Sequence, residues 1–195
     1  FPILKGRSEA SIVTRLGAFM RSPIVRNILA QKDSRLDFPA ILNTRQVLLA
    51  KLPQGAIGKE NAYLLGTLLV AKLHETAIAR QHLPEAERAD WFLYIDEFHN
   101  FVTPSLASIL SGTRKYRLGL ILSHQDLTQL KERSTEVLAS VLANAGTRIC
   151  FRLGAQDAKK LAEDFASFDA RDLQNLGQGE AIGRIGKTTD DFNLR

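Results

Sequence analysis

Short apolar runs alternate with longer segments of helical periodicity along the chain. Four apolar runs predict strands, at 46–52, 91–95, 118–122 and 148–153. The run at 91–95 lacks the alternation of a half-exposed strand, which is typical of a strand covered on both faces. Helical spacing of apolar residues predicts helices over 8–32, with a new start at Ser22-Pro23, and over 58–82, 105–115, 135–145 and 157–166. Two final strands joined by a turn are expected at 180–185 and 191–194.

This alternation of strands and helices predicts an α/β fold, with a mostly parallel sheet and helices on both of its faces. We expect a basic helical lead-in over 1–45, the α/β core over 46–178 and a C-terminal strand pair over 179–195. Ligands of such sheets bind beyond the carboxyl ends of the strands. The residues that follow each strand are therefore the first candidates for chemistry.

The composition is that of a soluble globular chain in a reducing compartment. The 195 residues are 45% hydrophobic and 24% charged, which is enough for a core without covalent staples. The single cysteine, Cys150, excludes an internal disulfide and a cysteine-rich zinc site. The longest apolar run, 62–71, is about half the length that a bilayer requires. A cytoplasmic location is expected, and Phe1 in place of a methionine leads us to expect a longer parent protein.

The net charge of +5 lies near the N-terminus. Residues 1–35 hold seven basic and two acidic side chains, whereas residues 36–195 are balanced. A basic stretch can meet nucleic acid or another polyanion, but it is also typical of a solvated helix face. The charge alone therefore assigns no DNA-binding residue.

Two acids follow the apolar run at 91–95. Asp96 and Glu97 complete the Walker B arrangement of nucleoside triphosphatases. That chemistry needs one acid at the strand end to hold Mg²⁺ through its water shell, and a second acid to orient the attacking water. Asp96 is the candidate for the first role and Glu97 for the second. A strand that simply runs into a polar loop has the same sequence pattern, so the motif needs support from other residues of the chain.

The next strand supplies a neutral amide. Ser123-His124-Gln125 follows the run at 118–122, so Gln125 lies beside the acids if the two strands are neighbours. An amide donates and accepts without carrying charge, which suits the sensing of a γ-phosphate or the holding of the water. Arg114 and Arg117 lie at the end of the preceding helix. An arginine there could contact a phosphate in its own or a neighbouring subunit, or it could complement the helix dipole.

The segment from 93 to 125 resembles the HerA/FtsK superfamily of hexameric DNA-pumping ATPases. The resemblance rests on Leu93-Tyr94-Ile95-Asp96-Glu97-Phe98-His99-Asn100-Phe101, then Arg114-Lys115-Tyr116, then Ser123-His124-Gln125. It is closest to the HerA-like and conjugative coupling protein (TraG/TraD-like) branches. Further similar segments are Ser11–Leu16, Ile57-Gly58, 144–149 and 151–154. The chain looks like the C-terminal half of the motor domain.

This resemblance implies a RecA-like domain of the P-loop NTPase type, assembled as a homo-hexameric ring with ATP and Mg²⁺ between subunits. Asp96 matches the Mg²⁺-associated Walker B acid, Glu97 the catalytic glutamate and Gln125 the γ-phosphate-sensing glutamine. Arg114 best matches the arginine finger that acts on the neighbouring subunit's nucleotide. Relatives often carry glycine soon after the Arg-Lys-aromatic run, where this chain has Arg117. Both arginines therefore stay candidates for the finger.

A phosphate-binding loop is missing from the part of the chain before the Walker B motif. The pattern G-x-x-x-x-G-K-[ST] has no match between Phe1 and Asp90. A relaxed match at 181–188 lacks the following helix that a P-loop needs, so we expect a turn between two strands there. The P-loop is expected on sequence upstream of Phe1. The chain alone should bind ATP weakly or not at all and be inactive as an enzyme.

Other chemistries fit these residues less well. Asp96, His99 and His124 could converge as a zinc site, but His99 has no partner at helical spacing. Ser123 and His124 lack a nucleophile elbow, and adjacent strand residues point to opposite faces. A non-catalytic oligomerisation or partner-binding module stays open as an alternative, as does a type IV secretion ATPase that moves protein rather than DNA.

The sequence thus predicts the C-terminal part of a ring-forming ATPase that couples ATP hydrolysis to DNA translocation, as a DNA pump or in conjugative DNA transfer. Its expected partners are further copies of itself, DNA, and a nuclease or secretion-system component. The segment itself is expected to make no membrane contact, although upstream sequence could anchor the parent protein to the inner membrane.

Overall fold

The chain folds into two compact units in a computed structural model that describes residue 17 and residues 19–194. The first unit lies within Phe1–Ile95 and Gly112–Ile121, and the second within Asp96–Ser111 and Leu122–Arg195. Residues 8–16 and 18 of the helix predicted over 8–32, which include the family-like segment at 11–16, fall outside the described residues. Each unit is described by itself below.

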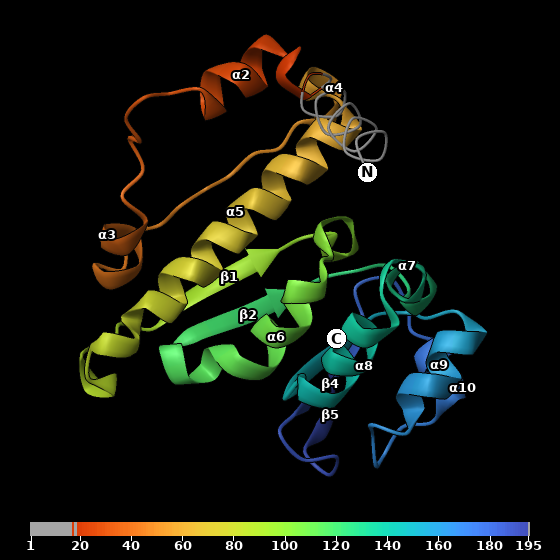
Figure 1. The fold of residues 1–195 in the computed structure, drawn as a ribbon. Helices are drawn as coiled ribbons and strands as arrows, with labels where there is room; N and C mark the ends of the chain where they lie inside the picture. The colour runs from red at the N-terminus through yellow and green to blue at the C-terminus, as the bar shows by residue number, and fades with distance from the viewer. Residues whose placement is uncertain (1–16, 18, 195) are drawn as a thin grey trace, which may run out of the picture. The chain divides into compact units, whose positions relative to one another are not determined.

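The first unit is built mainly from helices and a pair of strands (Figure 1). In chain order its elements are α2 (Pro23–Leu29), α3 (Phe38–Asn43), α4 (Gln54–Ile57), α5 (Lys59–Ala79), the 3₁₀ turns η1 (Arg80–His82) and η2 (Glu85–Glu87), β1 (Trp91–Ile95), η4 (Thr113–Tyr116) and β2 (Leu118–Leu122). The predicted helix over 58–82 is confirmed as α5 with η1, and Ser22 caps α2 as the sequence indicated.

The second unit combines short helices with an antiparallel sheet. Its elements are η3 (Phe98–Phe101), α6 (Pro104–Gly112), α7 (Leu127–Arg133), α8 (Thr135–Asn144), β3 (Thr147–Cys150), α9 (Ala155–Ala162), α10 (Ala170–Gln174), β4 (Ala181–Ile185) and β5 (Asp191–Leu194). The helices predicted over 105–115 and 135–145 are confirmed, whereas the one predicted over 157–166 begins and ends earlier, as α9. Helices α7 and α10 were not predicted.

Strands β1 and β2 are neighbours and parallel. Trp91 N donates to Arg117 O at 3.1 Å where both strands begin, and Phe98 N donates to Ser123 O at 3.0 Å just after both have ended. One face packs on α5 and α3, because Trp91, Leu118 and Leu73 belong to one buried cluster. The expectation that β1 is covered on both faces is wrong for the described residues, since Tyr94 is 73% exposed.

The strand predicted at 46–52 is absent. The segment has no strand partner among the described residues, and Val47 and Leu49 are 85% and 89% exposed. Only its other side is covered: Leu48 packs against the buried cluster, and Gln46 O accepts a hydrogen bond from Trp91 Nε1 at 3.1 Å. An apolar run signals burial only where a neighbouring strand or helix covers both sides, and this one has cover on one side.

The second sheet has the order β3-β4-β5 and is antiparallel throughout. The strand predicted at 148–153 is real but shorter, and it pairs with β4 rather than extending the parallel pair. The relaxed P-loop match at 181–188 is confirmed as a decoy, because it forms β4 and the turn that follows, where Gly186 takes a φ of +75°. Phe192 lies over Gly183, leaving no room for a Cβ there.

Two buried arginines join this sheet to the end of α8. Arg148 and Arg184 stand opposite each other in the register, and both form ion pairs with Asp164. Arg148 Nη2 donates to Leu142 O at 3.1 Å, and Arg184 Nη2 donates to Ala145 O at 3.0 Å. These carbonyls lie in the last turn of α8 and just beyond it, where helix carbonyls lack intrahelical partners. Burial lowers the pKa of Arg148, but the charge is kept.

Arg80 plays the corresponding part in the first unit. Its side chain is 2% exposed at the end of α5. The guanidinium donates to Asn43 Oδ1 at 3.0 Å, Ala89 O at 3.0 Å and Tyr116 O at 3.1 Å, and also to Leu42 O. One fork thus ties α3, the segment before β1 and η4 to the same helix end, because five fixed donors serve several acceptors at once.

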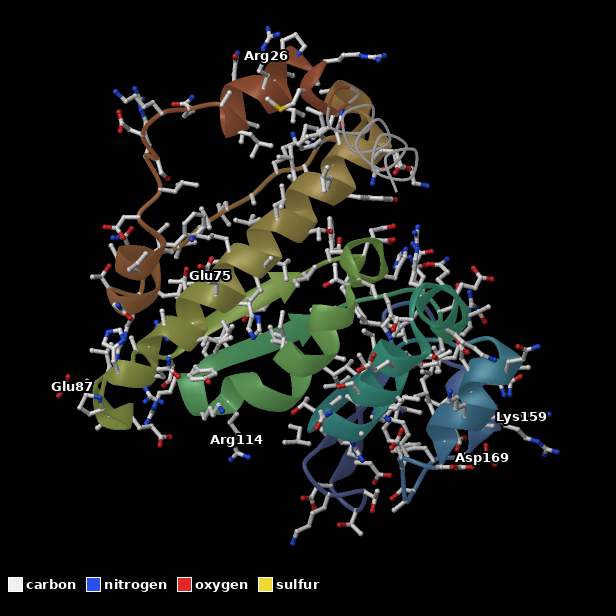
Figure 2. All side chains as sticks on the ribbon, viewed as in Figure 1. Arg26, Glu75, Glu87, Arg114, Lys159 and Asp169 are labelled. Atoms are coloured by element: carbon white, nitrogen blue, oxygen red, sulfur yellow. The ribbon has the colours of Figure 1, made fainter. Side chains whose placement is uncertain are left out.

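We expect Arg80→Lys to lower the free energy of unfolding by about 2–4 kcal/mol, because a lysine cannot reach these acceptors together and leaves buried carbonyls unpaired. Urea denaturation of the chain measures this. Arg26→Lys, at an exposed position of α2 (Figure 2), is the matched control and should stay within about 0.5 kcal/mol. Equal effects of the two substitutions would contradict the anchoring role.

Candidate functional site

Asp96 follows β1 directly and is fixed through one of its oxygens. Oδ1 accepts hydrogen bonds from Glu97 N at 3.0 Å and from the Ser123 hydroxyl. Oδ2 has no hydrogen-bond partner among the described residues. Ser123 follows β2, so the carboxylate is held by the segment after the neighbouring strand. One free oxygen on an exposed, anchored carboxylate suits a hard cation that also takes oxygen ligands from water and phosphate.

The backbone of Glu97 is left-handed. Its φ is +51° and its ψ is +43°, a conformation that costs a residue with a Cβ about 1–2 kcal/mol. Glu97 N lies 3.0 Å from Asp96 Oδ1 and 3.4 Å from Ser123 Oγ, and Asn100 N donates to Glu97 O at 3.0 Å. These contacts hold the chain in a sharp turn between β1 and η3. Strained backbone of this kind is characteristic of functional sites.

The Glu97 carboxylate has a partner on each oxygen. Gln125 Nε2 donates to Oε1 at 2.6 Å, and His99 Nε2 lies 3.5 Å from Oε2. The structure therefore brings together Asp96, Glu97 and Gln125, the three residues that the sequence placed at the ends of two strands. Their chemical roles stay predictions.

Two members of the cluster, Ser123 and His99, were not predicted as part of it. Their positions in the sequence suggested only hydrolase or zinc chemistry, which fits them poorly. Within the described part of the chain, no three His, Cys, Asp or Glu side chains are grouped so that they could hold a metal ion. The only available signal was position, because both lie within three residues of Asp96 or Gln125.

A buried aromatic ring packs against the turn between β1 and η3. Phe98 is fully buried and meets the His124 ring edge-on, with ring centroids 5.4 Å apart at an interplanar angle of 83°. Burial lowers the pKa of His124, whose Nδ1 lies 3.2 Å from Asp126 O. His124 therefore packs against the turn as a neutral ring at pH 7. Its neighbours in sequence, Ser123 and Gln125, make the polar contacts to Asp96 and Glu97.

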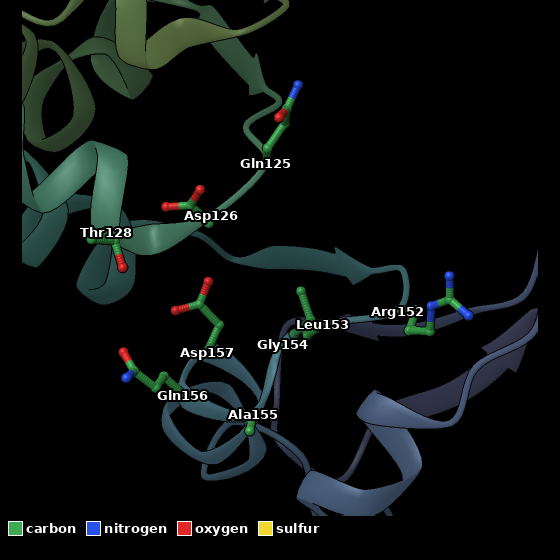
Figure 3. A pocket seen from close by; sticks show the side chains of 9 residues that line it. All are labelled: Gln125, Asp126, Thr128, Arg152, Leu153, Gly154, Ala155, Gln156 and Asp157. Atoms are coloured by element: carbon green, nitrogen blue, oxygen red, sulfur yellow. The ribbon is translucent and has the colours of Figure 1, made fainter.

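A pocket of about 280 Å³ opens beside Gln125 (Figure 3). Gln125 and Asp126 line it from the segment after β2, and Arg152 and Asp157 line it from around the start of α9. Asp157 Oδ2 accepts a hydrogen bond from Leu127 N at 3.0 Å, which fixes one wall. The Gln125 side chain thus lies between an acid cluster and an open space large enough for part of a ligand.

The two candidate arginines differ in their local partners. Arg117 Nη1 lies 3.2 Å from Asp90 Oδ1, whereas the exposed Arg114 guanidinium has no partner among the described side chains (Figure 2). Arg117 takes a φ of +54°, the left-handed region that glycine favours. The departure from the relatives' glycine therefore falls at a position whose backbone suits glycine. Of the two arginines, Arg114 is the one whose guanidinium has no partner in the part of the chain that the structure describes.

Comparison with known proteins places this site in a family. Residues 91–187 match the family model described as "TraM recognition site of TraD and TraG". This segment, just under half of the chain, is similar to the TraG/TraD family. The resemblance inferred from the residues between 93 and 125 is thereby confirmed. A search of curated protein sequences gives no match.

Solved structures similar to the TraG/TraD-like chain share its fold. The bacterial conjugative coupling protein TrwB matches with a TM-score of 0.60 at 15% identity, covering 70% of this chain and 37% of TrwB. TrwB in complex with ADP and Mg²⁺ matches with a TM-score of 0.56 at 16% identity, covering 69% of this chain and 37% of that one. The genome-packaging NTPase B204 of Sulfolobus turreted icosahedral virus 2, in complex with ATP-γS, matches with a TM-score of 0.50 at 16% identity, covering 84% of this chain and 72% of B204.

At these identities the likeness establishes the fold, which is the predicted RecA-like fold of P-loop NTPases with a parallel sheet. The chain spans about 37% of the length of TrwB. In the part of the TraG/TraD-like chain that the structure covers, no helix combines the length and the apolar character that crossing a bilayer requires.

We expect Glu97→Gly to be more stable than Glu97→Ala by about 1 kcal/mol, because both lose the carboxylate but only glycine relieves the left-handed strain. At the exposed helical position Glu75 on α5 the order should reverse, with Gly about 1 kcal/mol less stable than Ala. Chemical denaturation of the four variants gives both differences. A preference for alanine at both positions would show that Glu97 stores no strain.

Proposed function

We propose that this chain carries the Walker B and glutamine motifs of a ring-forming motor that couples ATP hydrolysis to movement of DNA. The observation that carries the proposal is the contact of Gln125 Nε2 with Glu97 Oε1 at 2.6 Å, beside the anchored Asp96. A carboxylate that can take a proton and an amide that can sense a phosphate meet directly. Enzymes that transfer a phosphoryl group to water act mainly by positioning the reactants and stabilising the charge of the transition state, and this pair of side chains suits that task.

Asp96 is proposed to hold Mg²⁺ through the water shell of the ion. Magnesium in nucleotide sites is bound through one or two carboxylates together with waters and substrate phosphates, so one anchored carboxylate suffices. The free Oδ2 of Asp96 fits this donor set. When bound there, Mg²⁺ would supply positive charge that offsets the negative charge of the nucleotide phosphates. The existence of TrwB complexes with ADP and Mg²⁺ and with a non-hydrolysable ATP analogue supports this choice of ligand.

Glu97 is the proposed acceptor of the proton from the attacking water. The water oxygen bonds to the γ-phosphorus as the bond from that phosphorus to the ADP oxygen breaks, and one water proton passes to Glu97 Oε1. Gln125 holds Oε1 before nucleotide is present, and the same amide can turn to a γ-phosphate oxygen because an NH₂ group offers two donors. Release of Oε1 is thus tied to the arrival of the phosphate.

The remaining parts of the site are proposed to come from elsewhere in the assembly. The segment 181–188 is a strand and turn, so the phosphate-binding loop is proposed to lie on sequence outside this chain. Arg114, exposed and without a partner among the described side chains, is proposed to reach the nucleotide of a neighbouring subunit in a homo-hexameric ring. The exposed Phe92 and Tyr94 on one face of β1 support the presence of further structure against that face.

The family description favours a second candidate function. It names a TraM recognition site in TraD and TraG, so a partner-binding module whose acids no longer hydrolyse ATP is the alternative. A secretion-system ATPase that moves protein, and a nuclease as an accessory partner, belong to the same set of proposals. We place the segment on the cytoplasmic side, with any membrane anchor on upstream sequence.

In the intact polypeptide that carries this chain, Glu97→Gln should abolish ATP turnover while ATP stays bound, because the amide keeps the shape but accepts no proton. Nucleotide retention on a filter and phosphate release measure the two effects. Glu163→Gln in the second unit is the control and should leave turnover unchanged. Unchanged turnover in Glu97→Gln would exclude Glu97 as the proton acceptor, whereas absence of turnover in the wild type would favour the partner-binding module.

Arg114→Ala should lower turnover by about 10³–10⁵-fold with ATP binding spared, which is the range for loss of an arginine finger. Arg117→Gly is the matched control, because it removes the guanidinium and glycine suits the left-handed backbone at this position. It should retain turnover within about threefold, since Arg117 is paired with Asp90. The reverse order of the two effects would assign the finger to Arg117.

A further inference from the structure

His99 is the second partner of the Glu97 carboxylate, and it has no role in the family motif as described above. It lies in η3, the turn that begins after the left-handed residue, and this turn carries its ring back toward Glu97. His99 Nε2 is 3.5 Å from Glu97 Oε2, and the His99 side chain is 11% exposed, against 42% for Glu97. The contact therefore lies on the inner side of the carboxylate.

The other ring nitrogen of His99 restricts what this contact can be. Nδ1 is buried and has no hydrogen-bond partner among the described residues. A protonated ring would carry a second N–H at Nδ1 with no acceptor, and leaving a buried donor unpaired is costly. The arrangement is therefore satisfied best by a neutral ring that carries its proton on Nε2, the nitrogen 3.5 Å from Glu97 Oε2.

The two partners of Glu97 differ in mobility. Gln125 is exposed, lines the open pocket and is free to turn. His99 is confined, because its neighbour Phe98 is fully buried and the turn is closed by Asn100 N donating to Glu97 O at 3.0 Å. When the Gln125 amide leaves Oε1, the His99 contact is the one that keeps the carboxylate in place.

We propose that His99 is a positioning residue that holds Glu97 Oε2, so that Oε1 is presented to the attacking water once Gln125 turns to the γ-phosphate. This inference rests on the proposed function. A glutamate side chain released from Gln125 would otherwise sample several rotamers, and fixing it in advance is worth about tenfold in rate. The contribution falls on the chemical step rather than on nucleotide binding, because His99 contacts the acid alone.

Two substitutions separate the contact from bulk. His99→Gln places an amide NH₂ where Nε2 lay, whereas His99→Asn places it near Nδ1, too short to reach Oε2. In the intact polypeptide we expect His99→Asn to lower kcat by about tenfold with the KM for ATP unchanged. His99→Gln should restore kcat to within about threefold of the wild type. Equal losses in both variants, a loss confined to KM, or no loss in His99→Asn would overturn the positioning role.

A second measurement tests the contact without turnover. The chain has four histidines, so selective ¹⁵N labelling and His99→Gln assign the His99 signals. The wild-type ring should show the Nε2–H tautomer, and Glu97→Ala should shift its Nε2 signal while His74, on α5, stays unchanged. An Nδ1–H tautomer, or no response to Glu97→Ala, would overturn the contact.

The two measurements also separate this inference from the proposed function. Wild-type protein without ATP turnover would overturn the proposed function, and the positioning role with it, even if the tautomer is as expected. Turnover that depends on Glu97 but is unchanged in His99→Asn would overturn the positioning role alone.

Discussion

The hydrogen bond from Phe98 N to Ser123 O, at 3.0 Å, joins the two chain segments that carry the acid–amide cluster. This cluster consists of Asp96, Glu97, His99, Ser123 and Gln125. It continues the pairing of β1 with β2 by one step beyond the strands. Ser123 can then bond Asp96, and Gln125, two residues later, can bond Glu97. Because parallel strands end at the same edge of a sheet, two stretches 27 residues apart in sequence become one site.

The site combines strain with dense local bonding. Glu97 takes a left-handed backbone conformation at a cost of about 1–2 kcal/mol. In this conformation the two oxygens of its carboxylate contact different partners. The partner on Oε1 is exposed beside a pocket, and the partner on Oε2 is buried in the turn. An acid held in this way can give up one contact to a ligand and keep the other, which suits a site where nucleotide binding must precede proton transfer.

Much of this was predictable from the sequence, and the exceptions have a common physical cause. The runs at 91–95 and 118–122 formed strands, and their trailing residues met as expected because strand ends converge. The contact with His99 depends on the left-handed backbone conformation of Glu97. A glutamate in the sequence does not indicate that conformation. The run at 46–52 stayed unpaired, because an apolar sequence indicates that burial would be favourable but does not show which neighbouring element would cover it. In the same way, no residue of β3 indicates from the sequence that its partner strand, β4, runs antiparallel to it.

The measurement that tests the central claim most directly is ATP turnover by the intact polypeptide in the presence of Mg²⁺, with and without duplex DNA. We expect turnover that rises when DNA is added, because the acid–amide cluster is assigned to a DNA-moving motor. Turnover that ignores DNA would contradict the assignment to DNA transport. Absence of turnover under both conditions would contradict the claim that Asp96, Glu97 and Gln125 form a hydrolytic site.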